Sequence, residues 1–153
     1  MTDPVALLQL ASEVEAGTGP DRELDARVWA AIHGGRVVDR ASPHWMGFVW
    51  LNPRAELLGD AEASPPLTAS VDASLGLLRE VLPGWQYELH SNGAVPMAFL
   101  GEINVGYGDD DGTIIGSSAA GSLPRAIVAA VLRAAARGEG VARRAPISYP
   151  SAD

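Results

Sequence analysis

The fold is decided by residues 70–93, which read SVDASLGLLREVLPGWQYELHSNG. Leucine and valine recur at helical spacing behind Ser70, a residue suited to cap a helix. The pattern predicts a helix that ends at Pro83 and Gly84. Apolar and polar residues then alternate from Trp85 onward, which is the period of a half-buried strand. The Asn-Gly pair that closes the stretch is a strong hairpin signal, so a helix followed by an antiparallel hairpin is expected.

Downstream of this hairpin, the chain continues with strand and turn signals. Residues 97–103 predict a second strand, residues 106–112 a turn, and residues 113–116 a third short strand. Together the three strands form an antiparallel meander. A further period-two stretch at 46–51, bounded by prolines, predicts one more strand that can join the same sheet.

Three more helices are expected around these strands. They cover residues 3–16, 21–33 and 122–137, with Asp3, Asp21 and Ser122 as their caps. The predicted fold class is therefore α+β, an antiparallel sheet packed between helices as an α-β-α sandwich. One domain over residues 1–137 is expected, followed by an extended C-terminal tail over 138–153 that is rich in Gly and Pro.

Composition excludes several kinds of chemistry. The chain has 153 residues, a net charge of −8 and no cysteine, which removes thiol catalysis, disulfides and Cys-ligated zinc. It also has no lysine, which removes Schiff-base chemistry. The acidic balance disfavours binding to nucleic acid. No apolar run reaches about 18 residues and no leader opens the chain, so a soluble protein of the bacterial cytoplasm, without membrane contact, is expected.

The C-terminal part is locally basic, although the chain as a whole is acidic. One interpretation is a solvated helix face whose basic end complements the helix dipole, and the other is a small anion-binding patch. The arginines concerned are Arg125, Arg133, Arg137, Arg143 and Arg144.

Motifs that would carry catalysis or bind metal are missing from the sequence. The three histidines share no ligand spacing, and His33 is expected at the end of the second helix. The acids at 109–111 are contiguous, unlike the alternate ligands of an EF-hand. The glycine-rich stretch 101–108 has no lysine, and there is no Gly-x-Ser-x-Gly elbow. We therefore predict no catalytic residue, no metal ligand and no cofactor. Enzymatic activity is not favoured, although a hydrolase with paired carboxylates stays as an alternative.

The irregular segment 36–66 holds the candidate site for a ligand or partner. Its aromatic rings could stack on a flat molecule while its arginines hold an anion. Alternatively, its tryptophans pin the segment to the sheet or bury against a second subunit. The candidate residues are Arg40, His44, Trp45, Trp50 and Arg54.

Three segments in order carry a family resemblance. They are GPDRELDA at 19–26, TASVDASL at 68–75 with LPGW at 82–85, and LPRAIVAA at 123–130. This order resembles the phage ABA sandwich domain family of small phage and prophage proteins. The resemblance implies a sheet between helical layers, but no reaction, ligand or catalytic residue.

The resulting prediction is a phage or prophage accessory protein that is not an enzyme. It would bind a host protein or associate with itself as a homodimer. A protein that binds a small, nucleotide-like ligand is the alternative, together with the hydrolase above.

Overall fold

The computed structural model describes residues 3–39, 48–51, 57–60, 64–92, 95–101, 114–118 and 121–138. Its helices are α1 (Pro4–Ala16), α2 (Arg22–His33), α3 (Val71–Val81) and α4 (Leu123–Ala136). Its strands are β1 (Arg36–Asp39), β2 (Phe48–Leu51), β3 (Leu57–Asp60), β4 (Gln86–Asn92), β5 (Val95–Gly101) and β6 (Ile114–Ser117).

Three helices begin at the caps that the sequence predicts. The side chain of Asp3 accepts a hydrogen bond from the backbone N–H of Val5 at 3.0 Å. Asp21 accepts from Leu24 at 2.9 Å, and Ser70 accepts from the third residue after it at 3.2 Å. Each bond satisfies a backbone donor that the first turn of a helix leaves free. The predicted starts of α1, α2 and α3 are thereby confirmed.

Helix α4 begins where the sequence predicts, but the expected capping bond is missing. Ser122 stands at the N-cap position, but its side chain makes no capping hydrogen bond. Instead, the buried hydroxyl of Ser118 accepts from the backbone N–H of Ser122 at 3.2 Å. Ser122 therefore stands at the predicted cap position without the expected side-chain bond, and Pro124, two residues later, has no N–H to donate to it.

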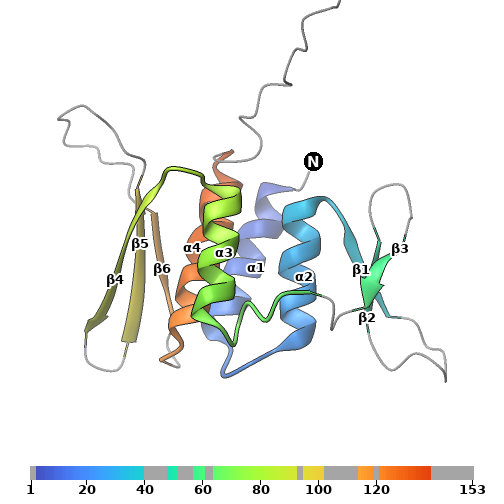
Figure 1. Ribbon diagram of the computed structural model, residues 1–153, viewed down its shortest axis with the longest axis horizontal. Helices are drawn as coiled ribbons and strands as arrows, with labels where there is room; N and C mark the ends of the chain where they lie inside the picture. The colour runs from blue at the N-terminus through green and yellow to red at the C-terminus, as the bar shows by residue number, and fades with distance from the viewer. Residues whose placement is uncertain are drawn as a thin grey trace, which may run out of the picture.

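The helices lie side by side in the middle of the molecule, and the strands flank them (Figure 1). Helices α2, α3 and α4 run in one direction and α1 runs in the opposite one. A sheet of order β4-β5-β6 packs against α4 on one flank. A second sheet, of order β1-β2-β3, contacts α2 through β1 and β2 on the other flank.

The buried core is almost entirely helical among the residues whose side chains are described. In α4 every residue from Ala126 to Leu132 has an exposed fraction of 0%. A helix that is apolar on all sides belongs in the interior. The face that the sequence predicts for α2, with Leu24 and Val28, is buried as well. None of the helices described is long and apolar enough to cross a membrane.

Sheet and helix touch backbone to backbone at Gly116. A Cβ at this position in β6 would lie 2.0 Å from the carbonyl oxygen of Ala126 and 2.6 Å from the amide nitrogen of Ala130. No other residue type fits between strand and helix at this distance, so glycine sets how closely β6 packs on α4.

The predicted fold class is wrong. Four helices dominate the described structure and hold its core, and no sheet lies between two helical layers. The strand at 48–51 does not extend the sheet of β4, β5 and β6, because it pairs with β1 and β3. Hydrophobic period distinguishes helix from strand, but it does not say which layer is central. The predicted tail covers 138–153, and its residues from 139 onward lie outside the described part of the chain. Part of the segment 36–66 lies outside it as well.

Candidate functional site

The structure describes only the backbone of one predicted site residue, Trp50. It lies in β2, in register with Val37 of β1 and Gly59 of β3. The other four predicted site residues lie outside the described residues; they are Arg40, His44, Trp45 and Arg54. The predicted site, in which aromatic rings stack on a flat molecule and arginines hold an anion, therefore stays a prediction.

The sheet that contains Trp50 has large apolar residues at positions on both of its faces. Partners in an antiparallel ladder share a face, and faces alternate along each strand. Val37 pairs with Trp50, and Phe48 lies two residues before Trp50, so these three positions share one face. The opposite face holds the positions of another apolar set, which is Val38, Val49 and Leu51.

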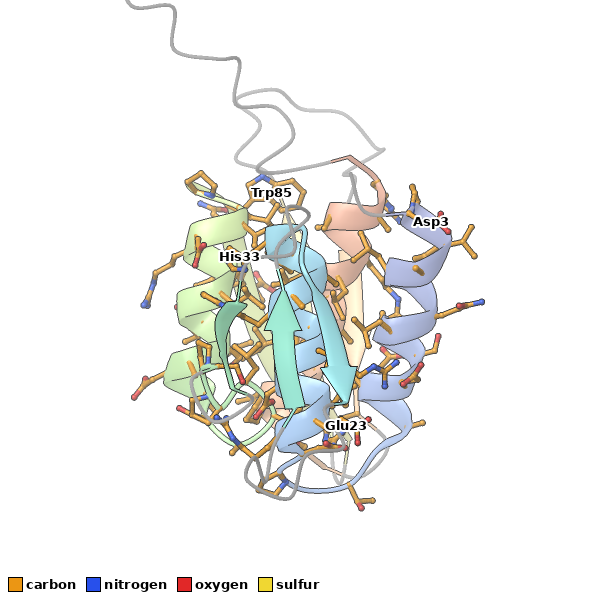
Figure 2. The ribbon with its side chains drawn as sticks, turned by 90° about the vertical axis from the view of Figure 1, so that its right-hand side faces the viewer. Asp3, Glu23, His33 and Trp85 are labelled. Carbon is orange, nitrogen blue, oxygen red and sulfur yellow. The ribbon has the colours of Figure 1, made fainter. Side chains whose placement is uncertain are left out.

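Only one face of this sheet packs against the helical layer. Strands β1 and β2 contact α2, and no other described helix or strand lies on the far side of the sheet (Figure 2). Whichever face meets α2, the other holds three large apolar positions. We name the face turned away from α2 the outer sheet face. Antiparallel sheets with one face in water usually alternate apolar and polar residues, and β1 and β2 do not.

A histidine and a carboxylate meet where α2 and α3 end. The Nε2 of His33 lies 2.6 Å from Oε1 of Glu80, and its Nδ1 lies 2.8 Å from the carbonyl oxygen of Trp29. The rings of Trp29 and His33 are 3.9 Å apart between centroids. A general base needs one nitrogen free to face its substrate. Both nitrogens of His33 face protein acceptors, so this pair links two helices and is not arranged for catalysis.

The position of His33 at the end of the second helix agrees with the sequence prediction. Figure 2 labels His33 and Glu23 at opposite ends of α2. The partner Glu80 is 47 residues away along the chain, and no local pattern in the sequence pointed to it.

A buried carboxylate joins the beginning of α2 to the segment before α3. Asp25 is fully buried and accepts from the backbone N–H of Thr68 at 2.7 Å and from Arg22 at 2.9 Å. Arg22 also donates to the carbonyl oxygen of Ser64 at 2.6 Å. Burial raises the pKa of Asp25 above its ordinary value, and the hydrogen bonds from Thr68 and Arg22 oppose that rise. With no exposed surface, this carboxylate anchors the fold and cannot meet a substrate.

A buried guanidinium closes the end of α1. Arg125 is 1% exposed and donates to the carbonyl oxygens of Val14 at 2.9 Å and Gly19 at 2.7 and 2.9 Å. A weaker bond of 3.4 Å reaches Thr18. A cation at a helix C-terminus complements the helix dipole. The sequence allowed two interpretations of the basic C-terminal part, a solvated helix face and an anion-binding patch. Arg125 fits neither, because it is not on a solvated face and is not available to an anion.

Two bidentate ion pairs tie α1 to its neighbours. Arg133 of α4 donates through both terminal nitrogens to Glu15. Arg27 of α2 does the same to Glu13, at 2.6 and 3.0 Å. The hydrogen bond from Arg27 lowers the pKa of Glu13 below its ordinary value. Arg133 is thus committed to α4–α1 packing, and it is removed from the anion-patch interpretation too.

No cluster that could hold a metal ion occurs among the described residues. The search covered groups of at least three histidine, cysteine, aspartate and glutamate side chains. No protein-family model matches the chain, and no curated protein or solved structure matches it.

Proposed function

We propose that this chain is a protein-binding module without catalytic activity, and that the outer sheet face is its binding surface. The observation that carries the proposal is that each face of the sheet formed by β1, β2 and β3 holds three large apolar positions, beside Asp39 on one face and Arg36 and Asp60 on the other, while one face packs on α2. Apolar patches on the surface of a protein are typical of interaction sites, because binding a partner removes them from water.

The chemically capable groups of the helical layer support a role without catalysis. His33 has acceptors at both nitrogens, and Asp25 and Arg125 are buried with their hydrogen bonds made inside the protein. In the part of the chain that is described, no buried side-chain nitrogen or oxygen lacks a partner. Polar groups kept ready for a ligand would instead be left without a protein partner. The small-ligand and hydrolase alternatives gain no support from these residues.

The size of the outer sheet face bears on the affinity. Three strands of four residues each cover on the order of 200 Å². A standard interface buries about 800 Å² on each partner. The face therefore suits the central apolar cluster of an interface, where a few large residues supply most of the binding energy.

The partner that fits the prediction from sequence is a host protein. The resemblance to small phage proteins supports a phage or prophage origin and action in the bacterial cytoplasm. These three elements belong to the proposal and rest on the resemblance alone.

Two substitutions test the outer sheet face, whichever face of the sheet meets α2. Trp50→Glu and Val49→Glu place a charge at positions on opposite faces of β2. We expect one variant to unfold at a lower temperature, because it buries the charge against α2. The other keeps the wild-type unfolding temperature but no longer binds the partner that wild-type protein captures from host lysate. Gln9→Glu, which adds the same charge on the exposed side of α1, serves as the control and keeps both properties.

Two outcomes would overturn the proposal. Equal destabilisation by both variants would mean that both faces are already covered within the chain. Unchanged capture by the stable variant would move the binding surface elsewhere.

A further inference from the structure

We infer that β4 pairs edge to edge with β4 of a second copy of this chain. Strand β4 is an edge strand, since the sheet order is β4-β5-β6 and its hydrogen-bonded neighbour in that order is β5. It lies on the flank of the helical layer opposite β1, β2 and β3 (Figure 1). The inference is therefore independent of the outer sheet face.

The β4 edge is long, regular and free of proline, and Glu88 is the one acidic residue along it. Proteins keep such edges very short or interrupt them with proline or a bulge. The strands β1, β3 and β6, which also end their sheets, have four residues each, whereas β4 has seven and contains no proline. Its pairing with β5 is regular over all seven residues. Tyr87 in this strand is one of the few large apolar side chains described as exposed, at 38%.

The strand is self-complementary in one antiparallel register. A two-fold axis through Leu89 is the arrangement that pairs all seven residues of both copies. It sets Glu88 opposite the partner's His90, and by symmetry the same pair occurs twice. It also sets Gln86 opposite the partner's Asn92, and Leu89 opposite the partner's Leu89. Moving the axis to Glu88 would oppose Glu88 to the partner's Glu88, which is unfavourable, and moving it to His90 would oppose His90 to the partner's His90, so neither shift keeps the Glu88–His90 pairs.

The dimer would contain one continuous six-stranded sheet of order β6-β5-β4-β4-β5-β6. Each copy would gain main-chain hydrogen bonds along an edge with which no described strand of the same copy pairs. Because each chain has a net charge of −8, the copies repel one another at long range. Salt near 0.15 M screens this repulsion over about 8 Å, so association is expected to strengthen from low to physiological ionic strength.

Sedimentation velocity over a range of protein concentrations tests the inference. We expect wild-type protein to form a dimer. His90→Glu opposes carboxylates at both symmetric positions and should weaken the dimer at least ten-fold, whereas the double variant Glu88→Lys/His90→Glu restores opposite charges and recovers it. Gln9→Glu changes the net charge as His90→Glu does, but on α1, and should leave the dimer intact.

Three results would overturn the inference. One is a wild-type monomer at all concentrations, and another is a dimer that His90→Glu does not weaken. The third is a dimer lost with Trp50→Glu or Val49→Glu and kept with His90→Glu, which would assign the contact to the outer sheet face. Amide hydrogen exchange checks the location of the contact, because the β4 amides that are not bonded to β5 should become slower to exchange on dimerisation while α1 amides stay unchanged.

Discussion

Arg125 occupies the space where a side chain at Gly17 would begin. A Cβ on Gly17 would lie 2.2 Å from Nη1 and 2.8 Å from Cζ of the guanidinium. The absence of a side chain at the end of α1 leaves room for an arginine 108 positions later, which donates to the carbonyl oxygens of Gly19 and Val14. Helix α4 thereby closes the C-terminus of α1, and the two helices are joined by both this cap and the Glu15–Arg133 pair.

Gly17→Ala is expected to destabilise the protein by about 2 kcal/mol. The new methyl group overlaps the guanidinium, which must shift and lose hydrogen bonds. The control is Gly76→Ala, since a Cβ in that position of α3 meets nothing within 4 Å. It should be neutral or should stabilise by about 0.5–1 kcal/mol, because alanine favours a helix. Urea denaturation measures both values, and equal effects of the two substitutions would contradict the close fit.

Arg125→Met should cost roughly 3 kcal/mol. Methionine keeps much of the length and packing but leaves buried carbonyl oxygens of the α1 end without donors. Arg137→Met, at the exposed end of α4, is the matched control and should change stability by less than about 0.5 kcal/mol. A loss at Arg125 no larger than at Arg137 would show that the cap is not needed for stability.

Asp25 should make the protein relatively more stable as the pH falls. Its pKa in the folded state is raised from the ordinary value of 3.8, mainly by burial. Between the unfolded and folded pKa values the native state holds a proton that the unfolded state has released, so the free energy of unfolding falls as the pH rises. Asp25→Asn removes this titration. The stability difference between wild type and variant should therefore shift in favour of wild type from pH 7 to pH 4, measured by urea denaturation. A difference that stays constant would refute the prediction.

Glu13 gives the opposite sign. Its pKa is lowered by the hydrogen bond from Arg27, so the pair stabilises the protein at neutral pH and loses that effect as the pH falls through the lowered value. The difference in the free energy of unfolding between wild type and Glu13→Gln should accordingly become smaller from neutral to acidic pH, measured by urea denaturation. A difference that grows at acidic pH would contradict this sign.

The two ion pairs of α1 should differ in coupling energy. Glu15 and Arg133 are 20% and 28% exposed, whereas Glu13 and Arg27 are 49% and 38% exposed. Less solvent screening strengthens the Glu15–Arg133 pair. Double-mutant cycles to alanine should give about 1–2 kcal/mol for Glu15–Arg133 and less than about 1 kcal/mol for Glu13–Arg27. The reverse order would show that exposure does not decide their strength.

Local signals made the helices predictable. The predicted range 3–16 compares with α1 at Pro4–Ala16, and 122–137 compares with α4 at Leu123–Ala136. Caps, glycines and apolar periodicity act over a few residues, so a single sequence carries them. The missing capping bond of α4 escaped this reasoning: Ser122 holds the predicted cap position, but Pro124, two residues later, has no N–H to donate to its side chain.

By itself, the sequence determined the helices, the segments that become β2, β4, β5 and β6, and the exclusion of thiol and lysine chemistry; it did not predict β1 or β3. Only the tertiary structure decided that the helices are central, that β2 joins a second sheet, and that Asp25 and Arg125 are buried anchors. Arg125 meets Gly19 across 106 residues and Asp25 meets Thr68 across 43. Such pairings depend on which layers pack together, and that choice follows from burying apolar surface over the whole chain, beyond the reach of any local pattern.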